Sequence, residues 1–184
     1  QKREIDLLQR ACDITESAFR RVLQFVKPGV MEYEIEAEYI HEFTRHGSRG
    51  FAYTPIVASG PSNCILHYID NSAKCKAGDL VLLDVGAEYA NYNADLTRTI
   101  PVSGRFTKRQ KDVYNAVLRV MRQAMKIMGP SVNFFDYQKQ VEKVMEGELL
   151  KLKLIDKTDI KNQKPGNPAL KKYFYHSTSH MLGL

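Results

Sequence analysis

The chain has 184 residues, of which 43% are hydrophobic, and 27 lysines and arginines outnumber 21 aspartates and glutamates, for a net charge of +6. This length and hydrophobic content predict one buried core and therefore one domain. No run of about 18 apolar residues and no signal-like N-terminal stretch occurs, so neither a membrane span nor secretion is indicated.

The first half of the chain passes from helices to strands. Two amphipathic helices come first, at residues 2–27 and 32–46, and Pro28-Gly29 ends the first of them. In the first helix, Ile5, Val22 and Leu23 belong to the stripe that is expected to face the core. Four strand-like segments follow, near residues 51–58, 64–68, 79–88 and 92–100.

The second half is mainly helical. Thr107 and Gln110 form a capping-box pattern that opens a helix extending to about residue 128. An amphipathic helix at 135–153, a loop at 154–170 and a short strand at 172–175 complete the chain. Helices on either side of an antiparallel sheet in the sequence predict an α+β domain.

Two aspartates, Asp84 and Asp95, lie in the run LLDVGAEYANYNADLTRT and are the strongest candidates for chemistry. Asp84 ends an apolar run typical of a buried strand, and Asn91 tolerates the positive φ of a tight turn before the next strand. Because the spacing of eleven is odd, a hairpin with an even-numbered loop places both carboxylates on one face, either directly opposite or diagonal. Solvated aspartates are the alternative, but a buried pair of like charges needs a cation, which favours a divalent metal site.

Three histidines extend this hypothesis. His67 interrupts a short apolar segment, and His176 and His180 lie four residues apart in YFYHSTSHMLGL. The zinc metalloprotease motif needs a glutamate after its first histidine, and Ser177 stands at that position, so that motif is absent. A hydrogen-bonded structural histidine is the alternative for each of them. Two other histidines fall in a charged helical stretch and read as structural or surface residues: His41 and His46.

Three motifs together resemble one enzyme family. They are ILHY at 65–68, the stretch at 84–99 that ends in TRT, and HxxSHxLGL at 176–184. In order and separation they resemble aminopeptidase P and prolidase, the proline-directed members of the dinuclear-metal "pita-bread" peptidases, over essentially the whole chain. Methionine aminopeptidases share that fold, but the TRT and SHxLGL sequences favour the proline-directed branch. The resemblance implies the first half of the pita-bread fold and the opening strand of its second half.

At the matching positions, the resemblance implies a role for each candidate residue. Asp84 would be a ligand of one metal, Asp95 a carboxylate that bridges both metals, and His180 the imidazole ligand of the other metal. His67 is similar to the histidine that contacts the scissile peptide, and His176 to a histidine of the substrate pocket.

The implied activity is that of a metal-dependent exopeptidase. It removes the N-terminal residue from peptides with proline in second position, by attack of a hydroxide held between two divalent metal ions. Carboxylates with one imidazole suit Mn²⁺, with Co²⁺ or Zn²⁺ as alternatives. Peptide substrates are the expected partners, and a homo-oligomer is compatible with the resemblance.

The chain departs from the family pattern at its end. Family members supply two further glutamate ligands downstream of SHxLGL, and this chain stops at Leu184. Because it also begins at Gln1 rather than Met, the expectation is that residues 1–184 are one partial catalytic domain of a longer protein. This partial domain is expected to bind metal weakly or not at all and to be inactive by itself.

Two other functions compete with this interpretation. A non-catalytic pita-bread module that binds peptides or proteins typically loses the ligands, whereas Asp84, Asp95 and His180 are all present here. Among enzymes, prolidase, which cleaves Xaa-Pro dipeptides, is the alternative.

The cysteines, and the lysines near the end of the chain, limit the other classes of function. Three cysteines without CxxC spacing predict reduced thiols and a cytoplasmic protein. The late lysines alternate with Asp156 and Asp159 without an aromatic stacking motif, which indicates a solvated surface rather than a nucleic-acid or membrane partner. They are Lys151, Lys153, Lys157, Lys161, Lys164, Lys171 and Lys172.

Overall fold

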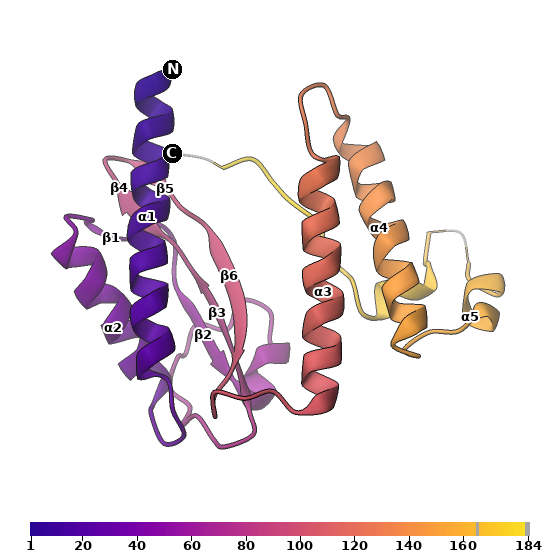
Figure 1. The fold of residues 1–184 in the computed structure, drawn as a ribbon, viewed down its shortest axis with the longest axis horizontal. Helices are drawn as coiled ribbons and strands as arrows, with labels where there is room; N and C mark the ends of the chain where they lie inside the picture. Colours follow the sequence, from indigo (N-terminus) through magenta and orange to yellow (C-terminus); the bar gives the residue numbers. More distant parts are fainter. Residues whose placement is uncertain (165, 183–184) are drawn as a thin grey trace. The chain divides into compact units, whose positions relative to one another are not determined.

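The computed structural model describes residues 1–164 and 166–182, which form two compact units (Figure 1). The first unit consists of Gln1–Phe106 together with Met181 and Leu182, and the second unit is Thr107–His180. Whereas the sequence predicted one core, the buried apolar residues gather into two clusters, one within each unit.

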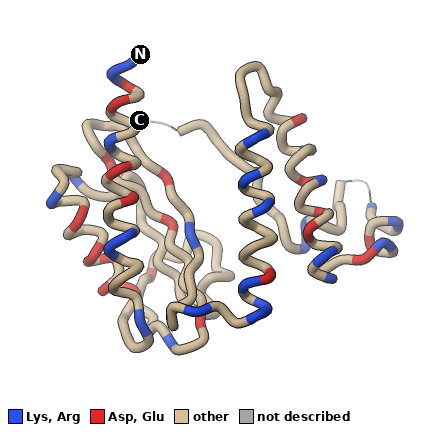
Figure 2. Tube along the Cα trace, in the orientation of Figure 1, with Lys and Arg blue, Asp and Glu red and all other residues tan. Residues whose placement is uncertain are grey.

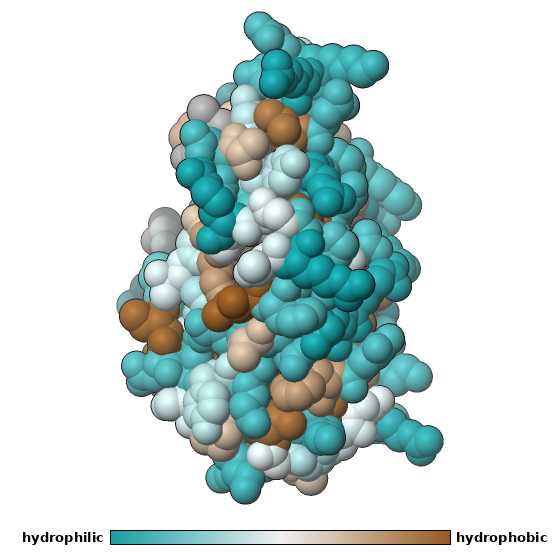
Figure 3. Space-filling model, turned by 90° about the vertical axis from the view of Figure 1, so that its left-hand side faces the viewer, coloured by the Kyte–Doolittle hydropathy of each residue, from teal (hydrophilic) through white to brown (hydrophobic). Residues whose placement is uncertain are grey.

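Two helices cover the sheet region of the first unit. Helix α1 (Lys2–Phe25) packs against α2 (Glu32–Arg45) and against strands β4 and β5. The buried stripe of α1 includes Ala11 and Ala18, whereas Ile5 and Leu23, which were predicted to face the core, are 65% and 47% exposed. Small residues at the contact allow the neighbouring elements to approach closely. The face drawn in Figure 3 is largely hydrophilic with scattered apolar residues, in keeping with helices that bury one stripe each.

The strands of the first unit form two antiparallel three-stranded sheets. One sheet has the order β2 (Ile56–Ser59), β3 (Leu80–Val85) and β6 (Leu96–Pro101). The other has the order β1 (Gly50–Phe51), β4 (Ala87–Tyr89) and β5 (Tyr92–Asn93). The segment predicted near 51–58 is thus two strands, β1 and β2, separated by residues 52–55.

A two-residue turn at Ala90 and Asn91 sets the register of the hairpin in which β4 pairs with β5 and β3 pairs with β6. Their φ angles are 52° and 68°, the left-handed values that a type I′ hairpin turn requires at both central positions. Tyr89 pairs with Tyr92 beside the turn, and Val85 pairs with Leu96 further along the same hairpin.

Gly86 divides the long hairpin into these two sheets. A Cβ atom at this position would lie 1.7 Å from the carbonyl oxygen of Ala94, so glycine alone permits the approach. The amide of Ala94 donates to the oxygen of Ala87 at 3.0 Å, and the amide of Ala52 donates to the oxygen of Gly86 at 2.8 Å. The strands predicted at 79–88 and 92–100 are therefore each broken into two.

The strand predicted at residues 64–68 is wrong. Gly60–Cys64 form a 3-10 helix, η1, with a proline at its start, and the following residues are loop. In this loop Tyr68 is 8% exposed, whereas Ile65, Leu66 and Ile69 are all more than half exposed. The apolar run that suggested a strand is thus mostly on the surface.

The second unit is helical. Helix α3 (Lys108–Ile127) starts at the predicted capping box, in which the amide of Thr107 donates to Oε1 of Gln110 at 2.8 Å. It packs against α4 (Phe134–Lys151), and α5 (Lys157–Lys161) and the 3-10 helix η2 (Ala169–Lys172) follow. The predicted loop at 154–170 therefore contains a short helix. The strand predicted at 172–175 is wrong, because η2 ends there and no strand follows within residues 166–182.

The core of the second unit lies between α3, α4 and the segments that follow them. Its buried members are Val120, Ala124, Tyr137, Val141, Met145, Leu149, Ile155 and Leu170. Of the described residues, no helix is long and apolar enough to cross a membrane.

The late lysines lie on a mixed-charge surface. Figure 2 shows basic and acidic residues interspersed along α4 and α5. Lys151 pairs with Glu148 at 2.8 Å and Lys171 pairs with Glu142 at 2.7 Å, so part of the positive charge is neutralised locally.

Candidate metal centre

The two predicted ligand aspartates lie side by side in the first unit. Asp84 is the fifth residue of β3, half-buried, and is paired with Thr97 of β6. Asp95 is exposed and immediately precedes β6, next to the Val85–Leu96 pair that ends the ladder. Because the turn is centred between Ala90 and Asn91, the carboxylates are diagonal neighbours, the second of the two registers that the sequence allowed.

The hydroxyl of Tyr53 joins the two carboxylates. It donates to Oδ1 of Asp84 at 2.8 Å and to Oδ1 of Asp95 at 3.1 Å. Both carboxylates therefore face the same side of the hairpin, as predicted. Burial, followed by the interactions with Asp84 and Asp95, raises the pKa of Tyr53 far above its ordinary value. The hydroxyl consequently keeps its proton and remains a donor.

Sequence reasoning missed Tyr53. It lies in the loop between β1 and β2, and its hydrogen bonds reach 31 and 42 residues along the chain. No local pattern links it to the aspartates. The ring of Tyr53 also lies close to Gly86, a contact that exists only in the folded chain.

The carboxylates of Asp84 and Asp95 fit a cation, but they are too few to form a complete set of metal ligands. Two carboxylates within reach of one hydroxyl repel each other, and that hydroxyl carries a single proton, so a divalent ion between them would be favourable. Over residues 1–164 and 166–182, no group of three or more histidine, cysteine, aspartate or glutamate side chains is arranged to hold a metal. Asp84 and Asp95 are thus suited to be part of a ligand set.

Asp95 is accessible from a surface pocket of the first unit. The pocket has a volume of about 320 Å³ and lies between α1 and the start of β6. Its other lining residues are Cys12, Thr15, Glu16, Phe19, Ala94, Leu96 and Arg98.

His67 lies on the surface loop that follows η1. It is exposed and has a φ of 52°, so it is not part of a buried strand as was predicted. Asn71, further along the loop, accepts from the amide of Val57 at 2.9 Å and donates to the oxygen of Pro55 at 3.0 Å. The loop therefore runs beside β2, the strand that pairs with β3.

His176 and His180 belong to the second unit. Both are exposed and follow η2 in a segment without regular structure. The ring of Tyr175 meets that of His176 edge to face at 5.8 Å, and the amide and hydroxyl of Thr178 donate to Oε1 of Gln138 at 2.8 Å each. The structure thus brings Asp84 and Asp95 together, and the roles of His67, His176 and His180 stay predictions.

The remaining histidines have structural contacts, as expected. The ring of His46 is hydrogen-bonded to Glu42 at 2.8 Å, and His41 lies 3.8 Å from the same carboxylate.

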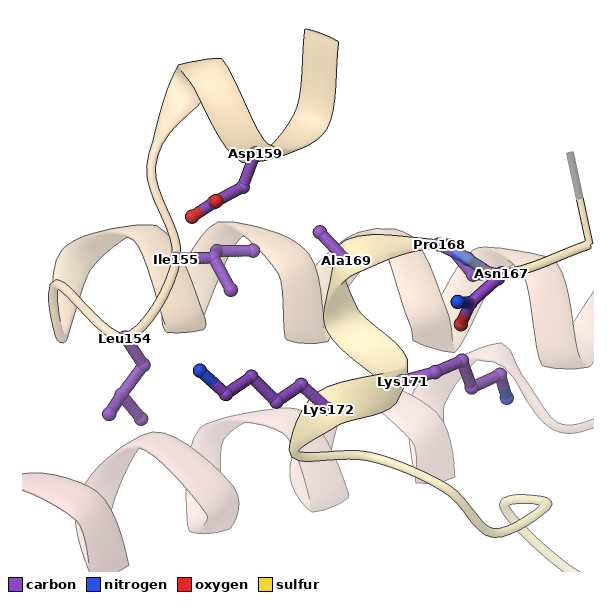
Figure 4. Close-up of a pocket in the computed structure, with 8 residues that line it drawn as sticks. All are labelled: Leu154, Ile155, Asp159, Asn167, Pro168, Ala169, Lys171 and Lys172. Atoms are coloured by element: carbon purple, nitrogen blue, oxygen red, sulfur yellow. The ribbon is translucent and has the colours of Figure 1, made fainter. Parts of the chain in front are cut away.

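A pocket in the second unit has no catalytic arrangement among its lining residues. Figure 4 shows its walls, which are Leu154, Ile155, Asp159, Asn167, Pro168, Ala169, Lys171 and Lys172. The carboxylate of Asp159 accepts from the amide of Asp156 at 2.9 Å as part of a helix cap, and Lys171 pairs with Glu142. Lys172 lies over the ring of Tyr173. The charged groups of this pocket are thus engaged in structural contacts, and Asp84 and Asp95 stay the better site.

The profile of metallopeptidase family M24 matches residues 6–184. This chain belongs to metallopeptidase family M24. It is 40% identical to the Xaa-Pro aminopeptidase of Escherichia coli strain K12 over 181 residues, which cover 98% of this chain and 41% of that protein. It is 36% identical to the Xaa-Pro dipeptidase of Mus musculus over 157 residues, or 83% of this chain and 32% of that protein.

A solved structure shows the same relationship in three dimensions. A Bacillus anthracis protein, provisionally named aminopeptidase P, superposes with a TM-score of 0.90 at 35% identity over 100% of this chain and 42% of that chain. These matches confirm the predicted family and the predicted pita-bread fold. This M24 chain spans about two fifths of the length of the E. coli relative.

We expect the M24 chain of residues 1–184 to bind at most one Mn²⁺ ion, weakly. Asp84 and Asp95 offer charge but too few ligands, so water must complete the coordination shell. Titration calorimetry measures this directly, and Asp84→Asn should remove the binding heat while Asp6→Asn, on the exposed face of α1, should not. Two sites with sub-micromolar dissociation constants would contradict the expectation.

Proposed function

We propose that this chain is part of a metal-dependent exopeptidase that removes the N-terminal residue from peptides with proline in second position. The observation that carries the proposal is the Tyr53 hydroxyl, which joins Asp84 and Asp95 at the positions predicted for metal ligands. The 40% identity to an E. coli Xaa-Pro aminopeptidase over 98% of the chain supports the substrate class.

The ligand roles follow from the chemistry of these side chains. Asp84 and Asp95 concentrate negative charge on one side of the hairpin, and Tyr53 fixes the orientation of both carboxylates. We assign His180 as a further ligand through its imidazole. The whole protein would hold two divalent ions, with Mn²⁺ the best match to mostly carboxylate ligands and Co²⁺ or Zn²⁺ as alternatives. When bound, such ions lower the pKa of water from 15.7 to about 7 and so supply a nucleophile at neutral pH.

The other histidines would act on the peptide. His67 is exposed on its loop and can donate a hydrogen bond to the scissile carbonyl, where negative charge develops during attack. His176 would contact the proline side of the substrate. The free amine of the substrate would be held near Asp84 and the metal ion that Asp84 would bind. That contact would restrict cleavage to the end of the peptide.

We expect the whole protein to hydrolyse Ala-Pro-Ala in the presence of Mn²⁺ and to lose the activity when a chelator removes the metal. The reason is that both the nucleophile and the carboxylate pair depend on the bound cation. Release of free alanine, measured by amino-acid analysis before and after Mn²⁺ is restored, checks the expectation. A matched peptide, Ala-Ala-Ala, should be cleaved much more slowly if proline is recognised.

The same assay separates the two competing functions. Cleavage of Ala-Pro but not of Ala-Pro-Ala would identify a dipeptidase, the alternative to which the 36% identity to the mouse Xaa-Pro dipeptidase points. No cleavage of either peptide by the metal-loaded protein would favour a non-catalytic module. A cytoplasmic location is also proposed, because the three cysteines are free thiols.

A further inference from the structure

Glu32 is a fully buried carboxylate at the first turn of α2, with 0% exposure. Its Oε1 accepts from the amide and the hydroxyl of Ser59 at 2.6 and 2.7 Å. Its Oε2 accepts from the hydroxyl of Tyr68 and the amide of Ala73, both at 2.8 Å. A buried carboxylate is tolerated only when its oxygens are hydrogen-bonded, and here each oxygen accepts two bonds. The positive end of the α2 dipole favours the same charge.

The four donor groups belong to three residues, which lie before, in the middle and near the end of the loop that carries His67. Ser59 ends β2 before the loop, Tyr68 is in its middle, and Ala73 is near its end. The amide of Glu32 in turn donates to the oxygen of Ala73 at 2.9 Å. One side chain therefore ties the start, the middle and the end of the loop to α2.

Tyr68 is the buried anchor of the central part of this loop. Its apolar neighbours Ile65, Leu66 and Ile69 are 57%, 66% and 57% exposed, so they contribute little burial to hold the loop in place. Tyr68 is 8% exposed, and its hydroxyl reaches Glu32. Among residues 65–69, the buried ring of Tyr68 and its bond to Glu32 therefore supply most of what holds the loop in place.

His67 immediately precedes this anchor and has a left-handed backbone, with a φ of 52°. Such a conformation is uncommon for residues other than glycine and persists where the surrounding contacts impose it. We propose that Glu32 is a positioning residue that, through Tyr68, holds His67 in the orientation needed to act on the substrate. This inference rests on the proposed function, because it gives His67 a role in the reaction.

Tyr68→Phe tests the link by removing only the hydroxyl, and Tyr39→Phe is its matched control. Tyr39 lies on α2 with 0% exposure, and its hydroxyl has no hydrogen-bond partner in the described part of the chain. In the whole protein, Tyr68→Phe should lower kcat for Ala-Pro-Ala by about 10-fold to 100-fold with little change in KM, the order expected for a misplaced catalytic group. Tyr39→Phe should leave both constants unchanged. Glu32→Gln should lower kcat at least as much, and Tyr68→Phe decides the question if that variant does not fold.

Two further measurements distinguish positioning from general support of the fold. In a His67→Ala background, Tyr68→Phe should cause no further loss of kcat, because the group that it positions is absent. The backbone order parameter at His67, measured by NMR, should fall from about 0.85 in the native protein to below about 0.6 in Tyr68→Phe. An equal loss of kcat in the His67→Ala background, or an unchanged order parameter, would overturn the proposal. If the native protein cleaved no peptide, the proposed function would be wrong. The order parameter at His67 would then decide by itself whether Glu32 holds the loop.

Discussion

Asp95→Asn in the whole protein is expected to lower kcat/KM for Ala-Pro-Ala by about 10³-fold or more. This loss exceeds the roughly 10²–10³-fold that follows when one hydrogen-bond donor to the transition state is removed. Asparagine has nearly the same shape but no charge, and Asp95 is exposed, so the fold should be preserved. The carboxylate pair joined by Tyr53 would then carry one charge instead of two, and its attraction for a divalent ion would weaken accordingly. Steady-state kinetics over a range of Mn²⁺ concentrations measures the effect.

Asp6→Asn is a suitable control for this experiment. Asp6 is exposed on α1, and the same change of charge there should leave kcat/KM unaltered. If Asp95→Asn retained activity within tenfold of the native protein at saturating Mn²⁺, Asp95 could not be a bridging ligand, and the metal assignment would have to be abandoned.

The location of the two aspartates shows what the sequence could predict. Alternation along strands was enough to place Asp84 and Asp95 on one side of a hairpin. It could not choose between the two registers, because Ala90 gives no sign of the left-handed conformation that it adopts beside Asn91. That choice made the two carboxylates diagonal neighbours.

Long-range contacts account for most of what was missed. Tyr53 reaches both aspartates across the folded chain, and no spacing rule connects it to them. The segment around His67 looked like a strand because it is apolar, but it is a loop in which Tyr68 donates a hydrogen bond to the buried Glu32. This partner of Tyr68 is 36 residues away in the sequence, so the local pattern could not reveal it.

Helix patterns were more reliable where large side chains are buried than where small ones are. Ile35, Tyr39 and Phe43 recur every four residues on α2, and all three are 0% exposed. On α1 the same approach selected Val22, which is buried, but also Ile5, which is exposed. It passed over Ala11 and Ala18, which are both buried. A hydrophobicity pattern weights alanine lightly, although close helix packing requires it.

Gly86→Ala is expected to lower the free energy of unfolding by about 4 kcal/mol or more, a loss as large as severe steric strain causes. The added Cβ would lie 1.7 Å from the oxygen and 2.6 Å from the carbonyl carbon of Ala94, and these are backbone atoms that no change of rotamer can move. Relief would require the hairpin to open between the two sheets, which would break the bond from the amide of Ala94 to Ala87. Urea denaturation followed by circular dichroism measures the loss as a lower midpoint.

Gly147→Ala is the matched comparison, because it makes the same chemical change without a clash. Gly147 lies within α4, and a Cβ there meets nothing within 4 Å, so alanine should stabilise by about 0.5–1 kcal/mol through its better helix propensity. Opposite changes in stability for the two variants would show that Gly86 is needed for the close approach of Ala94, and not for the flexibility that any glycine provides. An unchanged midpoint for Gly86→Ala would mean that the hairpin can relax at this bend. Because Asp95 directly follows Ala94, that relaxation would also move the carboxylate away from Tyr53, and the bend would no longer explain how the two aspartates meet.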